Sequence, residues 1–204
     1  MMTQADTRQR ILDSARALIY RRSYADVGVA EICAEAGVKK GSFYHFFPSK
    51  RDLTLAVLDA TFADLKRDLL DQAFADDVPP LARLRRFVAM NVRLQGDLHR
   101  ETGILPGCPF GNLAAEQATQ DQALRTKVAG LFGQVSAELR TALREAVAGG
   151  EIGPVDSDAT ATAMLAYLEG VILLAKTQND PAVLERLLPA MLDIRIPETN
   201  AAAP

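Results

Sequence analysis

The chain has 204 residues, of which 49% are hydrophobic and 24% charged, and its net charge is −3. This length allows one large domain or two modest ones, and the apolar content is ample for a core, which excludes a disordered chain. Residues 1–51 carry nine basic and five acidic side chains, a net charge of +4, which leaves −7 for the rest. A basic head on an acidic body is expected if only the head contacts nucleic acid.

Neither a disulfide framework nor a membrane segment is expected. Cys33 and Cys108 are the two cysteines of the chain, too few for such a framework. No apolar run of signal-peptide length follows Met1, and the most apolar internal segment, residues 165–175, is interrupted by Glu169. We therefore expect a cytoplasmic protein with no membrane function.

Apolar residues recur at steps of three and four, without a strand pattern, which predicts an all-α fold of about nine helices. We expect a first helix over residues 7–22, two short helices within 29–47 and a fourth from 50 to about 75. A linker at residues 76–80 precedes a fifth helix that begins near residue 81, and a small helix follows Pro109. The remaining helices are expected over 122–147, 156–177 and 181–192, with a disordered tail at 198–204.

Residues 32–50 have the pattern of a helix-turn-helix. Cys33 and Ala36 are small where two helices would cross, and Gly37 stands where the first helix must end and the chain must turn. The apolar face of the pair is formed by Ile32, Cys33, Ala36, Val38, Phe43 and Phe46. Two short, closely packed helices with a tight turn are typical of a DNA-binding helix-turn-helix.

The other face of the second helix is basic, aromatic and polar. Its members are Lys39, Lys40, Gly41, Ser42, Tyr44 and His45. Lys40 can neutralise a phosphate and the Tyr44 hydroxyl can donate to one, whereas Ser42 or His45 can reach base edges. The alternative is that the two lysines are ordinary solvated charges and that the aromatic residues only form a core.

The run over residues 7–53 closely resembles, without gaps, the amino-terminal domain of the TetR family of bacterial regulators. The family pattern I-A-x-x-A-G-V matches residues 32–38, K-G-x-x-Y-x-x-F matches residues 40–47, and P-S-K follows. Cys33 fills the usual Ala position. Lys39 replaces the usual Ser or Thr cap and Val29 the usual Thr, so the helix caps or phosphate contacts of those two hydroxyls are in doubt.

The resemblance implies a DNA-binding domain at residues 1–53 and an effector-binding and dimerisation domain at 54–197. It adds Thr7, Arg8 and Lys50 to the predicted DNA contacts, although Thr7 and Arg8 could equally be a helix cap and a solvated charge. Relatives form homodimers through their last two helices, here residues 156–177 and 181–192. Such a dimer addresses half-sites of double-stranded operator DNA about 34 Å apart. The alternative is a thicker monomeric core.

The run G-C-P-F-G-N-L-A-A-E at residues 107–116 is similar to one in a subset of TetR-like regulators, some of which respond to reactive electrophiles or small unsaturated metabolites. Cys108 precedes a predicted helix, whose dipole favours the reactive thiolate. Lys176 would stabilise that thiolate further if the fold brings it near. The alternative is that Cys108 is a small buried hydrophobic residue.

A non-covalent effector pocket is the companion hypothesis. Its candidate lining residues are Met90, Leu94, Phe110, Leu113, Phe132, Met164 and Tyr167, although such residues more often form core. The predicted function is a DNA-binding repressor that is released by a small molecule or by modification of Cys108. We expect no catalytic residues, metal or cofactor.

Two alternative functions are compatible with parts of the sequence. The first is a structural or protein-binding module of the same fold that does not bind DNA, which the lysines and Tyr44 argue against. The second is a thiol hydrolase that uses Cys108 and His99, but no orienting residue or oxyanion site accompanies them.

Overall fold

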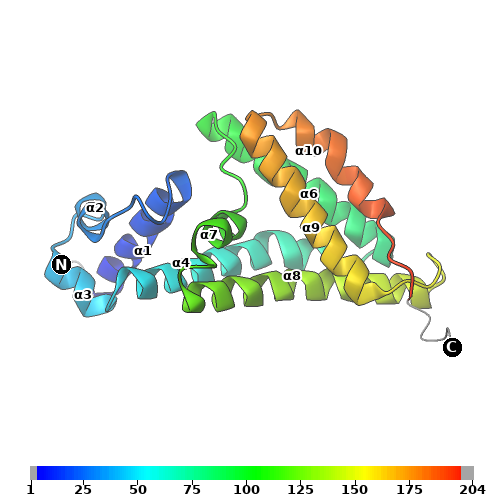
Figure 1. Cartoon of the computed structure of the whole chain (residues 1–204), viewed down its shortest axis with the longest axis horizontal. Helices are drawn as coiled ribbons and strands as arrows, with labels where there is room; N and C mark the ends of the chain where they lie inside the picture. Colours follow the sequence, from blue (N-terminus) through cyan, green and yellow to red (C-terminus); the bar gives the residue numbers. More distant parts are fainter. Residues whose placement is uncertain (1–3, 199–204) are drawn as a thin grey trace. The chain divides into compact units, whose positions relative to one another are not determined.

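The computed structural model of the chain describes residues 4–198, which are all-α without a strand in that range (Figure 1). This confirms the predicted fold class. The predicted disordered tail lies outside the described residues, apart from Glu198. The chain divides into two compact units. Unit 1 comprises the described residues of Met1–Asp64 and Pro109–Ala129, and unit 2 those of Leu65–Cys108 and Gly130–Pro204.

Unit 1 is built on three helices at the amino terminus, the longer α1 (Gln4–Arg21) and the short α2 (Val29–Glu35) and α3 (Lys40–Phe46). Each of them packs against the other two. The unit also holds α4 (Lys50–Leu65) up to Asp64, α7 (Pro109–Gln117) and the first part of α8 (Gln122–Ala148). The apolar stripe predicted for the first helix is buried, as Ile11, Leu12, Ala15 and Leu18 of α1 show.

The aromatic residues of α3 do not divide as the sequence suggested. Phe43 is fully buried, as predicted, but Phe46 packs against the core while remaining partly exposed. Phe47 takes the inner position and is only 3% exposed. The reason is that α3 ends at Phe46 and Phe47 adopts an extended conformation, which turns its ring back towards the core.

The turn between α2 and α3 depends on Gly37, as expected. Its φ is +62°, in the left-handed region, and the Val38 amide donates to the Cys33 carbonyl over 2.9 Å to close the turn. Arg10 donates from Nη2 to the Ala36 carbonyl. A Cβ added to Gly37 would lie 2.6 Å from the same Nη2 atom, so a side chain there would displace the end of Arg10 and would be strained by the left-handed φ.

Unit 2 begins within a long helical run. The residues after α4 form a π-helical stretch (Lys66–Leu70) and then α5 (Asp71–Ala73), so the fourth helix predicted over residues 50–75 is one continuous run with a local bulge. The fifth predicted helix is α6 (Pro80–Thr102), which is longer than its apolar pattern suggested because its last turns are polar. The later helices are the second part of α8, α9 (Ser157–Gln178), α10 (Ala182–Leu187) and a 3-10 turn (Leu188–Asp193).

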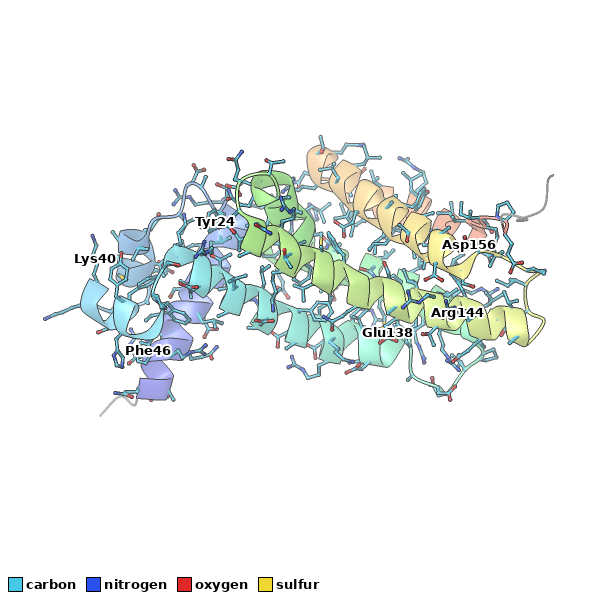
Figure 2. The ribbon with its side chains drawn as sticks, turned by 60° about the horizontal axis from the view of Figure 1, so that its bottom comes forward. Tyr24, Lys40, Phe46, Glu138, Arg144 and Asp156 are labelled. Atoms are coloured by element: carbon cyan, nitrogen blue, oxygen red, sulfur yellow. The ribbon has the colours of Figure 1, made fainter. Side chains whose placement is uncertain are left out.

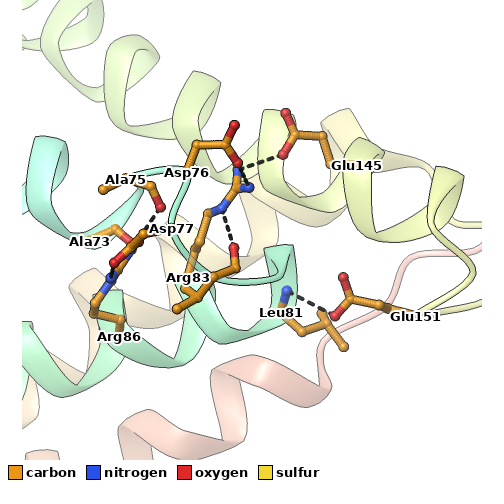
Figure 3. A network of polar contacts seen from close by, with 10 residues as sticks. Ala73, Ala75, Asp76, Asp77, Leu81, Arg83, Arg86, Glu145 and Glu151 are labelled. Atoms are coloured by element: carbon orange, nitrogen blue, oxygen red, sulfur yellow. Dashed lines mark hydrogen bonds and ion pairs between the residues drawn. The ribbon is translucent and has the colours of Figure 1, made fainter.

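Two arginines of α6 fix the linker at residues 74–79 (Figure 3). Arg83 is only 9% exposed; it donates to the Val78 carbonyl over 2.9 Å and binds Glu145 of α8 over 2.7 Å and Asp76. Arg86 donates to the carbonyls of Ala73 and Ala75 and binds Asp77, whose pKa it lowers through their hydrogen bond. The linker predicted as a loop is therefore held by charged side chains, in addition to the packing of Phe74 on Phe87.

Helix α9 is capped by a side chain at its start and by a left-handed residue at its end. The Asp156 carboxylate accepts from the Asp158 and Ala159 amides at 3.0 and 2.9 Å, and Asn179 closes the other end in the left-handed region. The helix packs on α10 and the 3-10 turn. By length and composition alone it is apolar enough to cross a membrane, but core helices pass the same test.

Replacing Gly37 by Ala should destabilise unit 1 by about 1–2 kcal/mol, because a side chain there is strained and displaces Arg10. Urea unfolding followed by circular dichroism measures this. Gly133→Ala in α8 is the matched control, since nothing lies within 4 Å of its added Cβ. Equal stability of Gly37→Ala and the wild type would contradict this account of the turn.

Candidate nucleic-acid interface and effector site

The outer face of α3 is formed by the residues that the sequence pattern singled out. Lys39, Lys40, Gly41 and His45 are exposed, Tyr44 is 54% exposed, and Ser42 is half-buried. Figure 2 shows Lys40 at the outer end of the three amino-terminal helices. The helix begins after Lys39 without a side-chain cap, as the missing hydroxyl at that position suggested.

The two exposed rings of α3 rest on rings of the core. Tyr44 packs edge-on against Phe43 with 5.1 Å between the ring centroids, and His45 packs edge-on against Phe46 at 4.8 Å. Such contacts orient a ring and restrict its rotamers. These ring contacts therefore fix the orientation of the exposed Tyr44 and His45 side chains.

Two further predicted DNA contacts lie at the start of α1. Thr7 is half-buried and Arg8 is exposed. The Arg8 guanidinium lies over the Phe47 ring, 5.1 Å from its centroid. This cation–π contact places the charge of Arg8 beside the end of α3.

Lys50, the ninth predicted DNA contact, is turned towards the protein. Its ammonium donates to the carbonyls of Tyr24 and Val27, at 2.7 and 2.9 Å, and lies 4.0 Å from the centroid of the Tyr24 ring. Burial lowers the pKa of Lys50, while the charge of Glu116 raises it. Two of the three donors of the ammonium are thus used to hold the turn between α1 and α2.

Glu116 of α7 holds the same turn and was not predicted to have a role. Its two carboxylate oxygens accept from the backbone amides of Tyr24 and Ala25, at 3.0 and 2.6 Å. The signal was present in the sequence, because Glu116 is the last residue of the run at residues 107–116. Its partners lie more than 90 positions away along the chain, so no local pattern could identify them.

In unit 2, a turn with two glycines leads to Cys108. Gly103 and Gly107 have φ values of +73° and +82°, which side chains rarely adopt. Asn179, at the end of α9, accepts from the Leu105 amide at 2.8 Å and donates to the Gly103 carbonyl at 3.0 Å. The turn is thereby fixed to the end of α9.

Cys108 forms a hydrogen bond with the side chain of Glu169, in the middle of α9. Burial raises the pKa of Glu169, and the bond to Cys108 lowers it in part. Sequence reasoning considered Glu169 only as an interruption of an apolar segment. Lys176 lies seven positions further along α9, two helical turns, and therefore shares the side of the helix that carries Glu169.

A buried amide also belongs to this region. Gln95 of α6 is only 5% exposed; its Nε2 donates to the Gly107 carbonyl over a long 3.5 Å, and its Oε1 is buried without a hydrogen-bond partner. Buried polar atoms normally have partners, so this oxygen is an acceptor that the described residues leave unsatisfied. The sequence pattern gave no sign of it.

The predicted pocket residues have different surroundings. Phe110 and Leu113 are buried in unit 1, where the Phe110 ring packs on Phe62 at 5.9 Å. Those of unit 2 range from fully buried Met164 to Leu94, which is 38% exposed. The Tyr167 hydroxyl donates to the Leu187 carbonyl over 2.9 Å, and Met90 and Phe132 are half-buried.

A basic helix-turn-helix in which α3 presents lysines and aromatic rings defines a DNA-binding protein. Comparison with known proteins agrees. Residues 11–57 match the model of bacterial regulatory proteins of the tetR family, and residues 80–191 match a tetracyclin repressor-like C-terminal domain. The chain is 39% identical over 162 residues to the transcriptional regulator AcuR of Cereibacter sphaeroides, covering 78% of this chain and 72% of that protein.

Two further relatives support the assignment. The HTH-type transcriptional repressor NemR of Escherichia coli is 38% identical over 124 residues, which cover 61% of this chain and 60% of that protein. The crystal structure of the regulatory protein TetR from Rhodobacter sphaeroides superimposes with a TM-score of 0.80 and 34% identity, covering 92% of this chain and 98% of the other. The chain belongs to the TetR family. It is a DNA-binding transcriptional regulator and not an enzyme, so the hydrolase alternative is set aside.

Replacing Glu169 by Gln should change how stability depends on pH. The folded state holds the Glu169 proton more tightly than the unfolded state, so its stabilising contribution is complete below the ordinary carboxyl pKa and is lost as the pH rises through the raised value. Glu169→Gln should therefore gain stability relative to the wild type between about pH 4.5 and neutrality. Urea unfolding at several pH values measures this, with exposed Glu101→Gln as the control; a pH-independent difference would contradict the expectation.

Proposed function

We propose that the chain is a homodimeric repressor that binds operator DNA through the outer face of α3 and is released by an effector that acts at Cys108. The observation that carries the DNA-binding part is the set of exposed lysines and supported rings on α3. The observation that carries the effector part is the hydrogen bond between Cys108 and Glu169. The exposed leucines of α9 support the dimer.

For DNA binding, the proposed contacts divide by chemistry. Lys39 and Lys40 neutralise phosphates, and the Tyr44 hydroxyl donates to a phosphate oxygen. Ser42 and His45 reach base edges, while Gly41 lets the backbone come close to the duplex. Thr7 and Arg8 contact the flanking phosphates. A phosphate contact by Lys50 uses the third donor of its ammonium, so Lys50 contributes mainly by positioning the turn.

The proposed dimer uses an exposed stripe along α9. Leu173 and Leu174 are 60% and 48% exposed, although Ile172 and Ala175 beside them are buried. The exposed residues at four, eight and twelve positions before Leu174 are small: Gly170, Ala166 and Thr162. Small residues let two helices approach closely, and the leucines would gain from burial against a second copy. Together with α10, this stripe belongs to the last two helices, through which the resemblance implied a homodimer.

At the effector site, we propose that Cys108 reacts with α,β-unsaturated carbonyl compounds. Sulfur forms a bond to the β-carbon, the carbon–carbon π bond breaks, and the thiol proton ends on the α-carbon. Glu169 can hold that proton during the addition, because its carboxyl group already shares a hydrogen bond with the thiol. Gln95 Oε1 offers the adduct or a reversibly bound effector a buried acceptor.

Release of DNA follows from a shift between two conformations. An adduct at Cys108 adds atoms beside the turn over residues 103–108, which Asn179 and Gln95 hold in one arrangement. The adduct favours a different arrangement, and about 1.4 kcal/mol of preference lowers operator affinity tenfold. Lys176, on the same side of α9 as Glu169, is the proposed partner for the thiolate.

Replacing Lys40 by Ala should weaken DNA binding at low salt and reduce the slope of log affinity against log salt by about one unit, because one phosphate contact is lost. The duplex is first selected by the wild-type protein from a random-sequence pool. Lys66→Ala, an exposed lysine of unit 2, is the matched control. An unchanged slope for Lys40→Ala would remove Lys40 from the interface.

Replacing Cys108 by Ser should abolish release of this duplex by N-ethylmaleimide, while the unmodified variant still binds DNA. Mass spectrometry should find the adduct on Cys108 and not on Cys33, which is 4% exposed and whose thiol pKa is raised by burial. Release of DNA from Cys108→Ser as fast as from the wild type would sink the covalent mechanism.

A further inference from the structure

The turn between α1 and α2, residues 22–28, is held from two sides by opposite charges. The Lys50 ammonium donates to the carbonyls of Tyr24 and Val27, and the Glu116 carboxylate accepts from the amides of Tyr24 and Ala25. All of these residues belong to unit 1. Hydrogen bonds to charged side chains are roughly twice as strong as neutral ones, so these contacts hold the turn more firmly than neutral bonds would.

This turn leads directly into the helix-turn-helix. Gly28 is the residue before α2, its carbonyl accepts from the amides of Glu31 and Ile32, and α2 packs on α3. The position of the turn therefore sets where α2 begins and, through α2, the direction of the recognition helix. Arg22 adds a second tie, an ion pair with Glu31 of α2.

Other contacts fasten α7 and the start of α8 to α4 rather than to this turn. Phe110 packs on Phe62, and Arg51 lies 3.8 Å from Asp121, whose carboxylate caps α8. Lys127 pairs with Asp59. By contrast, Glu116, in the last helical turn of α7, bonds directly to the α1–α2 turn.

We propose that Glu116 is a positioning residue for DNA binding, the carboxylate through which α7 sets the α1–α2 turn and hence the recognition helix. The geometry requires a carboxylate, because both oxygens must accept from backbone amides. An amide side chain offers one acceptor oxygen and would bring its NH2 group against the second amide. An alanine offers none.

A second consequence rests on the proposed effector function. Glu116 follows Cys108 by eight residues, and α7 begins at the residue after Cys108. A change at Cys108 that moves α7 would reach the turn through Glu116. If α7 acts on the turn through Glu116, DNA binding by the Glu116 variants should not respond to the adduct, because α7 no longer positions their recognition helix.

The test compares Glu116→Ala and Glu116→Gln with the wild-type protein and with Glu101→Ala, an exposed carboxylate of α6. Affinity for the selected duplex should fall about tenfold or more for Glu116→Ala and less for Glu116→Gln, with Glu101→Ala unchanged. Hydrogen exchange of peptides spanning residues 22–28 should accelerate in the same order, while peptides of α9 remain unchanged. The exchange measurement reports the anchor even if DNA binding is lost for another reason.

Wild-type affinity and wild-type exchange in both Glu116 variants would overturn the proposal. Slower exchange at the turn would also overturn it. The effector arm is separate: N-ethylmaleimide should weaken DNA binding of the wild type and have little further effect on Glu116→Ala. If the wild type does not respond, the effector function of Cys108 fails, but the positioning role of Glu116 still stands on affinity and exchange.

Discussion

Phe43 is the side chain on which the DNA-reading part of the chain depends. Its ring is fully buried among α1, α2 and α3, and Tyr44 rests on its edge. Burial of a phenylalanine contributes about 1.5–3 kcal/mol, a large share of the stability of a small three-helix unit. It also determines which side of a seven-residue helix faces outward, because a turn of 100° would bury Tyr44 and expose the core ring. Which side chains of α3 face solvent is thus a consequence of packing inside unit 1.

The sequence was informative where structure is local. Periodic apolar residues located the helices, Gly37 located the tight turn, and the spacing of Lys40 and Tyr44 located an outward face that the structure shows as exposed. Each of these depends on residues within about one or two helical turns. Helical spacing also missed Phe47 as a core residue, because that residue follows the end of α3 and is extended.

The sequence was less informative where distant segments meet. Glu116 and the amides of Tyr24 and Ala25, or Cys108 and Glu169, are brought together only by the fold. Lys50 shows the complementary difficulty. The resemblance to the TetR family implied a phosphate contact for this lysine, but its ammonium is engaged with two backbone carbonyls. The charge of a side chain indicates which chemical groups it can bind, and the fold determines which of those groups lies within hydrogen-bond distance.

Because Cys33 is buried between α2 and its neighbours, the reactivity of its thiol reports on the opening of the helix-turn-helix. A thiol that is 4% exposed and whose pKa is raised by burial reacts with a disulfide reagent only when the helices around it separate. The rate of that reaction, compared with the rate for the unfolded chain, measures the free energy of opening of the helix-turn-helix. In a Cys108→Ser background this thiol is the only one in the sequence. The stiffness of the DNA-reading part, with and without DNA bound, can therefore be followed in the protein without attaching a label to its recognition helix.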